Sequence, residues 1–311
     1  MSAAGRRRAG TGSYVDLQVN GYLGVDFSQP GLTVADVRRV TEALVARGTE
    51  AYCPTVITSP LAAYRAVLPV LAAAMAEPDL RGHLLGIHLE GPFITPQACG
   101  AHRQSLIRKP DAALFDRWQE LAGGHIRLLT LAPEQEGTAA LIRHVVRRHV
   151  VVSLGHHLAD KPAIDRAVDA GAACCAHLGN GIPGLLPRHP NPIWAQLADD
   201  RLTGMFIADG HHLPPEFVSV ALRAKGLDHT ILTSDAAPVA GLPPGEYHTM
   251  GTTVVLEKTG RLSVKGESSL AGSSATLAEC VAWMRTWSGV GDEALTRMAR
   301  TNPLRLLGLA G

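Results

Sequence analysis

The stretch Leu84-Leu85-Gly86-Ile87-His88-Leu89-Glu90-Gly91-Pro92-Phe93 decides the fold of this chain. Its apolar run, Leu84–Leu89, has the length of a buried strand, and a charged residue, Glu90, stands at the carboxyl end of that run. A helical pattern, Asp111–Leu121, comes next in the sequence. A strand followed by a helix is the repeating unit of a parallel sheet that helices cover.

The same unit recurs on both sides of this stretch. The other β-prone segments are Val15–Val19, Ala51–Pro54, Ile126–Leu131, Val150–Leu154, Cys174–His177, Gly204–Ile207 and Thr230–Thr233. The other helical patterns are Thr33–Arg47, Leu61–Ala76, Gly137–Arg147, Lys161–Ala170, Ile193–Ala198 and Pro215–Lys225. Eight such strands predict an α/β fold closed into a (β/α)₈ TIM-like barrel. An open doubly wound sheet is the alternative, because periodicity alone does not show closure.

The pattern changes after the eighth strand. Thr252–Leu256 and Arg261–Val264 flank a Gly-containing turn and predict a β-hairpin insertion near 252–264. Helical patterns then resume at Ala275–Trp287 and Asp292–Arg300. No linker or internal repeat interrupts the chain, so we expect a single barrel domain. The expected organisation is a flexible tail at 1–13 and the barrel domain at 14–311.

The composition of the 311 residues narrows the class of protein. Hydrophobic residues make up 46% and charged residues 18%, which favours a large buried core. The net charge of +1 and an aromatic content of 5% argue against a nucleic-acid partner. The five cysteines include no CxxC pair, which is typical of reduced thiols in a cytoplasmic protein. No apolar run reaches about 18 residues, so we expect no membrane partner.

Polar residues follow several of the predicted strands. In a parallel barrel the catalytic groups collect at the carboxyl ends of the strands, so these residues should share one face. The segments concerned are Asp16–Gly21, Gly86–Phe93, Ser153–His157, Ala176–Gly181, Ala208–Pro214 and Thr233–Ala236.

Three of these residues form a candidate metal site. Glu90, His156 and His177 supply the carboxylate and two imidazoles of a minimal catalytic zinc site. Asp235 would serve as the base that activates the attacking water. The alternative for each is a local structural role, such as capping a turn or filling the core. The doublets His156-His157 and His211-His212 leave open which member points inward.

These segments resemble the N-acetylglucosamine-6-phosphate deacetylases of the amidohydrolase superfamily. Asp16–Gly21, Gly86–Phe93 and Ala208–His212 carry the resemblance, and Leu270–Ser273 and Asn302–Gly308 agree with it. The resemblance implies metal-dependent hydrolysis of an acetamido group, giving glucosamine 6-phosphate and acetate from N-acetylglucosamine 6-phosphate. It also implies one divalent metal ion per subunit, with Zn²⁺ expected and Fe²⁺, Co²⁺ and Mn²⁺ compatible with the same donors. The small-molecule partner is then an amino-sugar phosphate.

The resemblance also assigns roles to individual residues. Glu90, His156 and His177 become metal ligands and Asp235 the general acid/base. In the expected mechanism, His102 or a nearby backbone amide would hold the oxyanion. Arg188 would bind the phosphate as a guanidinium fork, with a solvated loop arginine as the alternative. The full set expected around the substrate is Ala101, His102, Asn180, Gly181, Arg188, His212, Leu270, Ala271 and Gly272.

The first strand departs from the wider superfamily. A His-x-His pair that binds a second metal is common there, but this chain has Gln18 and Asn20. Amides are poor zinc ligands, so we expect a mononuclear site in which Gln18 orients the attacking water.

Other departures concern the pocket and the domains. The family usually has an aromatic residue and an alanine where Gly179 and Gly181 stand, which predicts a looser pocket wall. We expect the small β-sandwich common in the family to be missing. Because the family site borrows from a neighbouring subunit, we expect a homodimer. Two alternatives stay open, an amidohydrolase for another N-acyl amine or cyclic amide and a non-catalytic sugar-phosphate binder.

Overall fold

A computed structural model describes residues 13–309 of the chain. Its main sheet has eight parallel strands, which adjoin one another in the order of the sequence. The strands are β1 (Tyr14–Val19), β4 (Thr49–Ile57), β5 (Ile87–Glu90), β6 (Ile126–Leu131), β7 (Val151–Leu154), β8 (Cys174–Cys175), β9 (Thr203–Ile207) and β10 (Thr230–Thr233).

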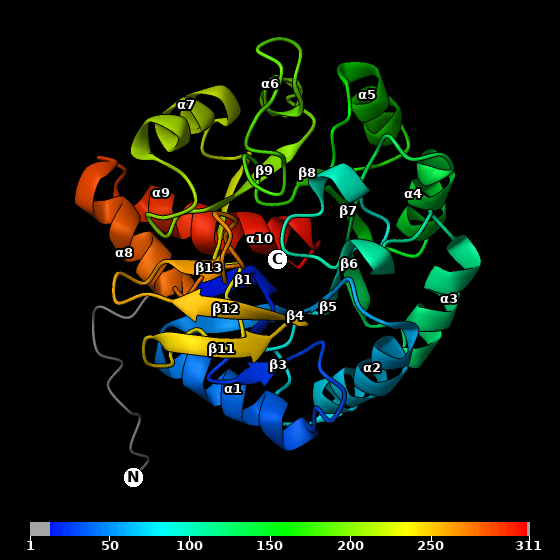
Figure 1. Ribbon diagram of the computed structural model, residues 1–311, viewed down its shortest axis with the longest axis vertical. Helices are drawn as coiled ribbons and strands as arrows, with labels where there is room; N and C mark the ends of the chain where they lie inside the picture. Colours follow the sequence, from blue (N-terminus) through cyan, green and yellow to red (C-terminus); the bar gives the residue numbers. More distant parts are fainter. Residues whose placement is uncertain (1–12, 310–311) are drawn as a thin grey trace.

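A ring of helices surrounds these strands (Figure 1). The helices that follow the strands are α1 (Val34–Ala46), α2 (Leu61–Ala76), α3 (Ala112–Leu121), α4 (Thr138–Val146), α5 (Lys161–Asp169), α6 (Pro192–Leu197), α7 (Pro215–Lys225) and α8 (Leu277–Trp287). Two short 3₁₀ turns, η1 (Pro96–Ala98) and η2 (Gln104–Leu106), follow β5. The chain ends in α9 (Asp292–Thr296), the π-helical η3 (Arg297–Thr301) and α10 (Asn302–Leu306). The predicted α/β barrel is therefore confirmed.

Local signals in the sequence fix where several helices begin. Thr33 and Asp36 form a capping box at the start of α1, and Thr276 and Glu279 form another at α8. Each box satisfies backbone N–H groups that have no partner inside the helix. Asp160 caps α5, with its side chain accepting from the N–H of the third helical residue. These caps orient the helices so that their apolar faces pack on the sheet.

The barrel closes between β1 and β10 through side chains as well as backbone. The Asp16 carboxylate of β1 accepts hydrogen bonds from the Thr233 hydroxyl at 2.7 Å and from the Ser234 N–H at 3.2 Å. Further up, the Asn20 N–H donates to the Ala236 carbonyl at 2.8 Å. Asp16 is 1% exposed, so burial raises the pKa of its carboxyl despite these hydrogen bonds. These hydrogen bonds place the end of β10 directly beside β1.

Two apolar cores hold the barrel together. The larger lies between the sheet and the helices. The smaller fills the inside of the barrel with Val15, Leu17, Cys53, Leu128, Cys174, Met205 and Ile231. Leu304, Leu306 and Leu307, in and just after α10, pack against this inner core. Because α10 closes one end of the barrel, a ligand can enter only at the other end.

A second, antiparallel sheet stands after β10. It contains β11 (Gly245–Thr249), β12 (Thr252–Leu256) and β13 (Leu262–Val264), and it is drawn in yellow and orange in Figure 1. The sequence pattern predicted the last two strands as a hairpin and missed β11. A short ribbon, β2 (Gly21–Tyr22) with β3 (Val25–Asp26), follows β1. The expected N-terminal tail lies outside the described residues except for Ser13.

Candidate metal centre and active site

Three polar residues stand two positions beyond the last residue of a barrel strand. They are His156 after β7, His177 after β8 and Asp235 after β10. All three have positive φ, at 52°, 28° and 54° respectively. This left-handed conformation is costly for a residue with a side chain and is concentrated at functional sites. The chain therefore turns sharply at each of these strand ends, and the three side chains face the barrel mouth.

These histidines converge on the carboxylate of Glu90, the last residue of β5. His177 Nε2 lies 2.9 Å from Glu90 Oε1, and His156 Nε2 lies 3.1 Å from the same oxygen. His102, from the loop after η1, brings its Nε2 to 3.2 Å from His156 Nε2 and 3.9 Å from Glu90 Oε1. The ligand atoms of Glu90, His102 and His156 all lie within 4.8 Å of one another. The sequence places His102 at the substrate, but it does not indicate that the ring reaches His156, because His102 does not follow a strand.

The donor set fits a divalent metal. Burial alone would raise the pKa of Glu90, but its contacts with His102, His156 and His177 hold that pKa well below its usual range. Burial lowers the pKa of His156 to about 4, so this imidazole is neutral and has a free lone pair at neutral pH. Carboxylate oxygens and imidazole nitrogens are the donors that bind zinc and similar ions.

Asp235 lies beside this cluster and is held by two amides. Asn20 Nδ2 donates to Asp235 Oδ1 at 2.7 Å, and Gln18 Nε2 donates to the same oxygen at 2.8 Å. Gln18 Nε2 also lies 2.9 Å from Glu90 Oε1. Burial, together with the nearby Glu90, raises the pKa of Asp235 to about 6. A carboxyl with that pKa exchanges a proton readily near neutral pH.

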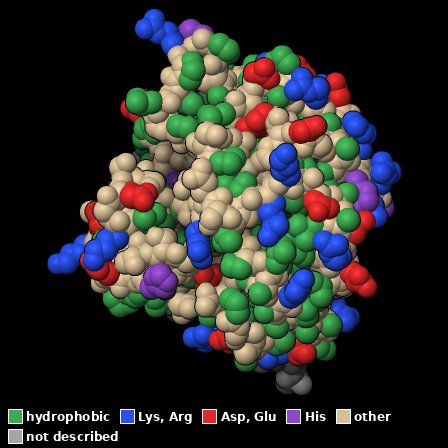
Figure 2. All heavy atoms as spheres, turned by 45° about the vertical axis from the view of Figure 1, so that its right-hand side comes forward, with side chains coloured by type: hydrophobic (Ala, Val, Ile, Leu, Met, Phe, Trp, Pro, Cys, Tyr) green, Lys and Arg blue, Asp and Glu red, His purple; other side chains and the backbone are tan. Residues whose placement is uncertain are grey.

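The cluster lies in a cavity of about 220 Å³ at the barrel mouth. Figure 2 shows a hollow on this side of the molecule, with a histidine side chain visible inside. Among residues 13–309, no lysine or arginine lines the cavity. The lining residues are Asn20, Ile57, Glu90, Gly100, Ala101, His102, His156, His177, Gly179, Asn180, Gly181, Ile182, Ile207, His212, Asp235, Met250, Ser269, Leu270, Ala271 and Gly272.

Most of the residues expected at the site line this cavity, but two do not. Gln18 lies behind the cavity wall, where its amide bridges two carboxylates. Arg188 is exposed on the loop between β8 and α6, which rises at the top of Figure 1. Asn20 belongs to the first-strand motif, but nothing in the sequence indicates that it pairs with Asp235.

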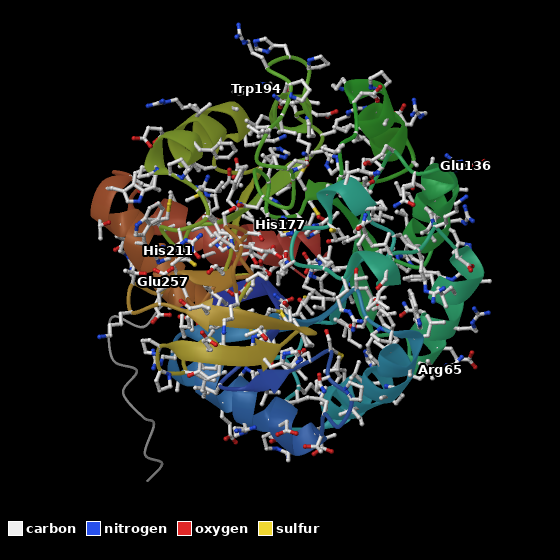
Figure 3. The ribbon with its side chains drawn as sticks, viewed as in Figure 1. Arg65, Glu136, His177, Trp194, His211 and Glu257 are labelled. Carbon is white, nitrogen blue, oxygen red and sulfur yellow. The ribbon has the colours of Figure 1, made fainter. Side chains whose placement is uncertain are left out.

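The structure also shows which member of each histidine doublet faces the cavity. His156 lines it, while His157 is buried and accepts the N–H of Ala159 through Nδ1. His212 lines it, while His211 is exposed and lies 3.1 Å from the Thr259 carbonyl. In Figure 3, His177 lies near the centre of the barrel and His211 lies outward, close to Glu257.

No family model matches the chain, but individual relatives do. The N-acetylglucosamine-6-phosphate deacetylase of Bos taurus is 37% identical over 308 residues, which cover 95% of this chain and 74% of the relative. The chain belongs to the N-acetylglucosamine-6-phosphate deacetylase family. The N-acetylgalactosamine-6-phosphate deacetylase of Escherichia coli O157:H7 is 34% identical, and the match covers 96% of this chain and 78% of that protein.

Solved structures of this deacetylase family share the fold. A mutant N-acetyl-D-glucosamine-6-phosphate deacetylase of Mycobacterium smegmatis, in complex with N-acetyl-D-glucosamine-6-phosphate, matches with a TM-score of 0.87 at 30% identity. The match covers 96% of this chain and 78% of that one. The predicted resemblance and the predicted enzyme class, a metal-dependent amidohydrolase, are therefore confirmed.

Within residues 13–309, no helix has both the length and the apolar composition that a membrane span requires.

Proposed function

We propose that the chain hydrolyses the acetamido group of N-acetylglucosamine 6-phosphate, releasing acetate and glucosamine 6-phosphate. One observation carries this proposal: the Asp235 carboxyl stands beside the Glu90–histidine cluster in the cavity. The name of the bovine relative gives the substrate.

The proposed metal ligands are Glu90, His156 and His177. The contacts of both histidines with Glu90 Oε1, at 3.1 and 2.9 Å, support this assignment. All three belong to the ends of barrel strands, which hold them more rigidly than the loop holds His102. His102 would then donate a hydrogen bond to the substrate carbonyl oxygen as it becomes an oxyanion. When bound, the metal supplies Lewis acidity, which polarises the scissile carbonyl and makes water a stronger acid.

Asp235 is the proposed acid/base. Its Oδ1 already accepts from Gln18 and Asn20, so Oδ2 is the oxygen left to face the reactants. Asp235 Oδ2 takes a proton from the attacking water and then gives it to the amine nitrogen that leaves. Gln18 thus acts on the water through Asp235, because its amide nitrogen is already hydrogen-bonded to two carboxylates.

The phosphate end of the substrate is proposed to meet His212 and Asn180, which line the same cavity. A second copy of the chain would add Arg188 from its exposed loop, which makes the enzyme a homodimer. Leu185 is 93% exposed on that loop and Trp194 is 50% exposed in α6 beside it. Contiguous exposed apolar patches mark protein interfaces, and these two side chains are the proposed apolar contacts of the second copy.

The test is acetate release by the metal-loaded enzyme. N-acetylglucosamine 6-phosphate, N-acetylgalactosamine 6-phosphate and unphosphorylated N-acetylglucosamine are compared side by side. We expect fast release from the first, slower release from the second and little from the third. If no sugar releases acetate while metal is bound, the proposed substrate is wrong.

The ligand assignment has its own test, which needs no turnover. Bound metal is counted by elemental analysis in His177→Ala and His102→Ala. We expect the first variant to lose the metal and the second to keep it. Loss of metal in His102→Ala alone would replace His177 by His102 in the ligand set.

A further inference from the structure

Asp209 is a buried carboxylate at the edge of the cavity, and the proposed reaction does not use it. Its side chain is 2% exposed and accepts four hydrogen bonds. Oδ1 accepts the backbone N–H groups of His211 and His212, both at 2.9 Å. Oδ2 accepts His212 Nδ1 and the Ser273 hydroxyl, both at 2.7 Å. The two oxygens therefore hold both the loop and the imidazole of His212.

This arrangement decides which nitrogen of His212 faces the cavity. Nδ1 must carry a proton to donate to the carboxylate, so Nε2 is the nitrogen left for a ligand. When Nε2 also carries a proton, it donates a charge-assisted hydrogen bond to an anion, while the Asp209 carboxylate behind Nδ1 keeps the ring in place. Among the described residues, the cavity has no lysine or arginine to bind an anion. His212 is therefore the group best placed to meet negative charge within this chain.

Ser273 connects this pair to the proposed acid/base. Its hydroxyl donates to Asp209 Oδ2, and its backbone N–H donates to the Asp235 carbonyl at 2.9 Å. Its own carbonyl accepts the Ala237 N–H at 2.8 Å. Ser273 follows Leu270–Gly272, which line the cavity. The anion-facing histidine and Asp235 are thus held by the same residue.

We propose that Asp209, supported by Ser273, is a positioning residue that orients His212 as the phosphate-recognition group of this deacetylase. The inference rests on the proposed function in one respect, that the substrate carries a phosphate. It adds that the preference for phosphorylated sugars depends on a carboxylate that touches no substrate atom.

The variants are Asp209→Asn (D209N) and Ser273→Ala (S273A). The amide of the first variant keeps an acceptor for the backbone N–H groups but removes the charge behind His212. S273A leaves the backbone pairing beside Asp235 in place. It removes one hydrogen bond from the carboxylate and the acceptor of the Ala275 N–H, so it serves if D209N fails to fold. The matched controls are the neighbouring His211→Ala, which removes an exposed imidazole, and Ser274→Ala, which removes a hydroxyl that donates to the Gly260 carbonyl.

Kinetics give the first readout. For D209N we expect KM for N-acetylglucosamine 6-phosphate to rise about tenfold. This is the loss of affinity expected when a charge-assisted hydrogen bond is replaced by a neutral one. We expect kcat to change less than KM, and kcat/KM for the unphosphorylated sugar to stay nearly constant. S273A should shift KM in the same direction by a smaller factor, and both controls should match the wild type. An equal loss on both sugars would show a merely structural role and overturn the inference.

Direct binding separates this inference from the proposed function. Glucosamine 6-phosphate and glucosamine are titrated by calorimetry into wild type and D209N. If the wild type binds the phosphorylated sugar more tightly and D209N loses that preference, the inference holds even when no acetate is released. If D209N binds glucosamine 6-phosphate as the wild type does, or if the wild type shows no preference, the inference is wrong.

Discussion

Asp235 combines a strained backbone with a carboxyl whose two oxygens are not equivalent. Its φ of 54° is unfavourable for a residue with a side chain, and burial with the nearby Glu90 raises its pKa to about 6. Two amides hold Oδ1, while no described residue donates a side-chain hydrogen bond to Oδ2. Strain of this kind persists where the surrounding contacts fix the conformation, as the Ser273 N–H does at the Asp235 carbonyl.

Replacing Asp235 by asparagine tests the proton-transfer role. The amide keeps the size of the side chain and cannot accept a proton at neutral pH, so we expect kcat to fall at least about a thousandfold. Metal content, measured by elemental analysis, should stay near that of the wild type, because Glu90 and the histidines are unchanged. Retained turnover would remove Asp235 from the mechanism.

Gly179 shows how a departure from the family pattern is compensated. A Cβ at this position would lie 2.8 Å from Phe217 Cζ and 2.9 Å from Leu213 Cδ2, and φ is +97°. The space that a side chain would take is therefore already filled by these two residues. The looser wall expected from the sequence does not follow at this position, because the filling side chains come from a different part of the chain.

Gly179→Ala should consequently destabilise the protein. The positive φ alone costs about 1–3 kcal/mol for a residue with a Cβ. Gly184→Ala is the control in the same loop, since a Cβ there meets no atom within 4 Å and the backbone is not in the left-handed region. Urea unfolding should show a lower free energy of unfolding for the first variant and a change within about 0.5 kcal/mol for the second. Equal stabilities would mean that the loop relaxes freely.

At the scale of single residues, the sequence predicts the polar residues that follow barrel strands. It does not predict the contacts that loop residues make with them. Glu90, His156, His177 and Asp235 follow apolar runs, and the barrel rule brings them to one face. His102 follows no strand, so no local pattern indicates that it reaches His156. Contacts of that kind depend on the path of a loop, which local pattern does not specify.

At the scale of elements, Asp199 joins three helices. It follows α6, its side chain is 3% exposed, and it accepts from Lys161 of α5 at 3.3 Å. Arg201 donates to both oxygens of the same carboxylate and also reaches Asp165 of α5 at 2.6 Å. Lys225, at the end of α7, donates to the Asp199 backbone carbonyl at 2.6 Å. These bonds align α5, α6 and α7 on the part of the barrel that includes β8.

The same contacts predict a pH dependence of stability. Arg201 holds the pKa of Asp199 well below its ordinary value of 3.8, so the ionised form stabilises the fold above that value. This stabilisation is lost as the pH falls from 3.8 towards the lower pKa of the folded state. Asp199→Asn should therefore cost about 1–3 kcal/mol at pH 7, and the cost should shrink in acid.

Urea unfolding of both proteins, from pH 7 down to the lowest pH at which the wild type folds, measures this difference. Asp200→Asn is the control, because Asp200 is exposed beside it. A cost for D199N that does not change with pH would show that shape, rather than charge, holds the three helices.

The elements themselves are the part of the structure that the sequence predicts best. The bounds of β6, β10, α2 and α7 agree with the apolar periodicity to the residue. β8 is shorter than expected, at two residues, because the chain turns at His177 with positive φ. β11 was missed because its residues, Gly245–Thr249, are only half-buried or exposed and lack an apolar run.

At the scale of the whole molecule, the position of Arg188 requires an explanation. It is the arginine expected at the phosphate, yet it lies on an exposed loop and does not line the cavity of its own chain. Figure 2 shows basic and histidine side chains at the tip of the projection at the top of the molecule. Leu185 on the same loop is 93% exposed. The proposed homodimer, in which each loop covers the other copy's cavity, would account for both facts.

Complementation between a binding-defective variant and an inactive variant, measured at low substrate, tests this arrangement. R188A keeps Asp235 and lacks the guanidinium, whereas D235N keeps Arg188 and lacks the base. If Arg188 serves the partner's cavity, a mixed dimer contains one site with both residues intact. Random mixing should then restore about a quarter of the wild-type activity at low substrate, since half of the dimers are mixed and each has one complete site. The two variants are unfolded and refolded together, or co-expressed, so that subunits exchange.

The control mixes D235N with H212A. His212 lines the cavity of its own chain, so that pair should form a mixed dimer in which both sites are defective. Recovery in the first mixture alone places Arg188 in trans, and no recovery in a confirmed mixed dimer means that Arg188 serves its own chain or none.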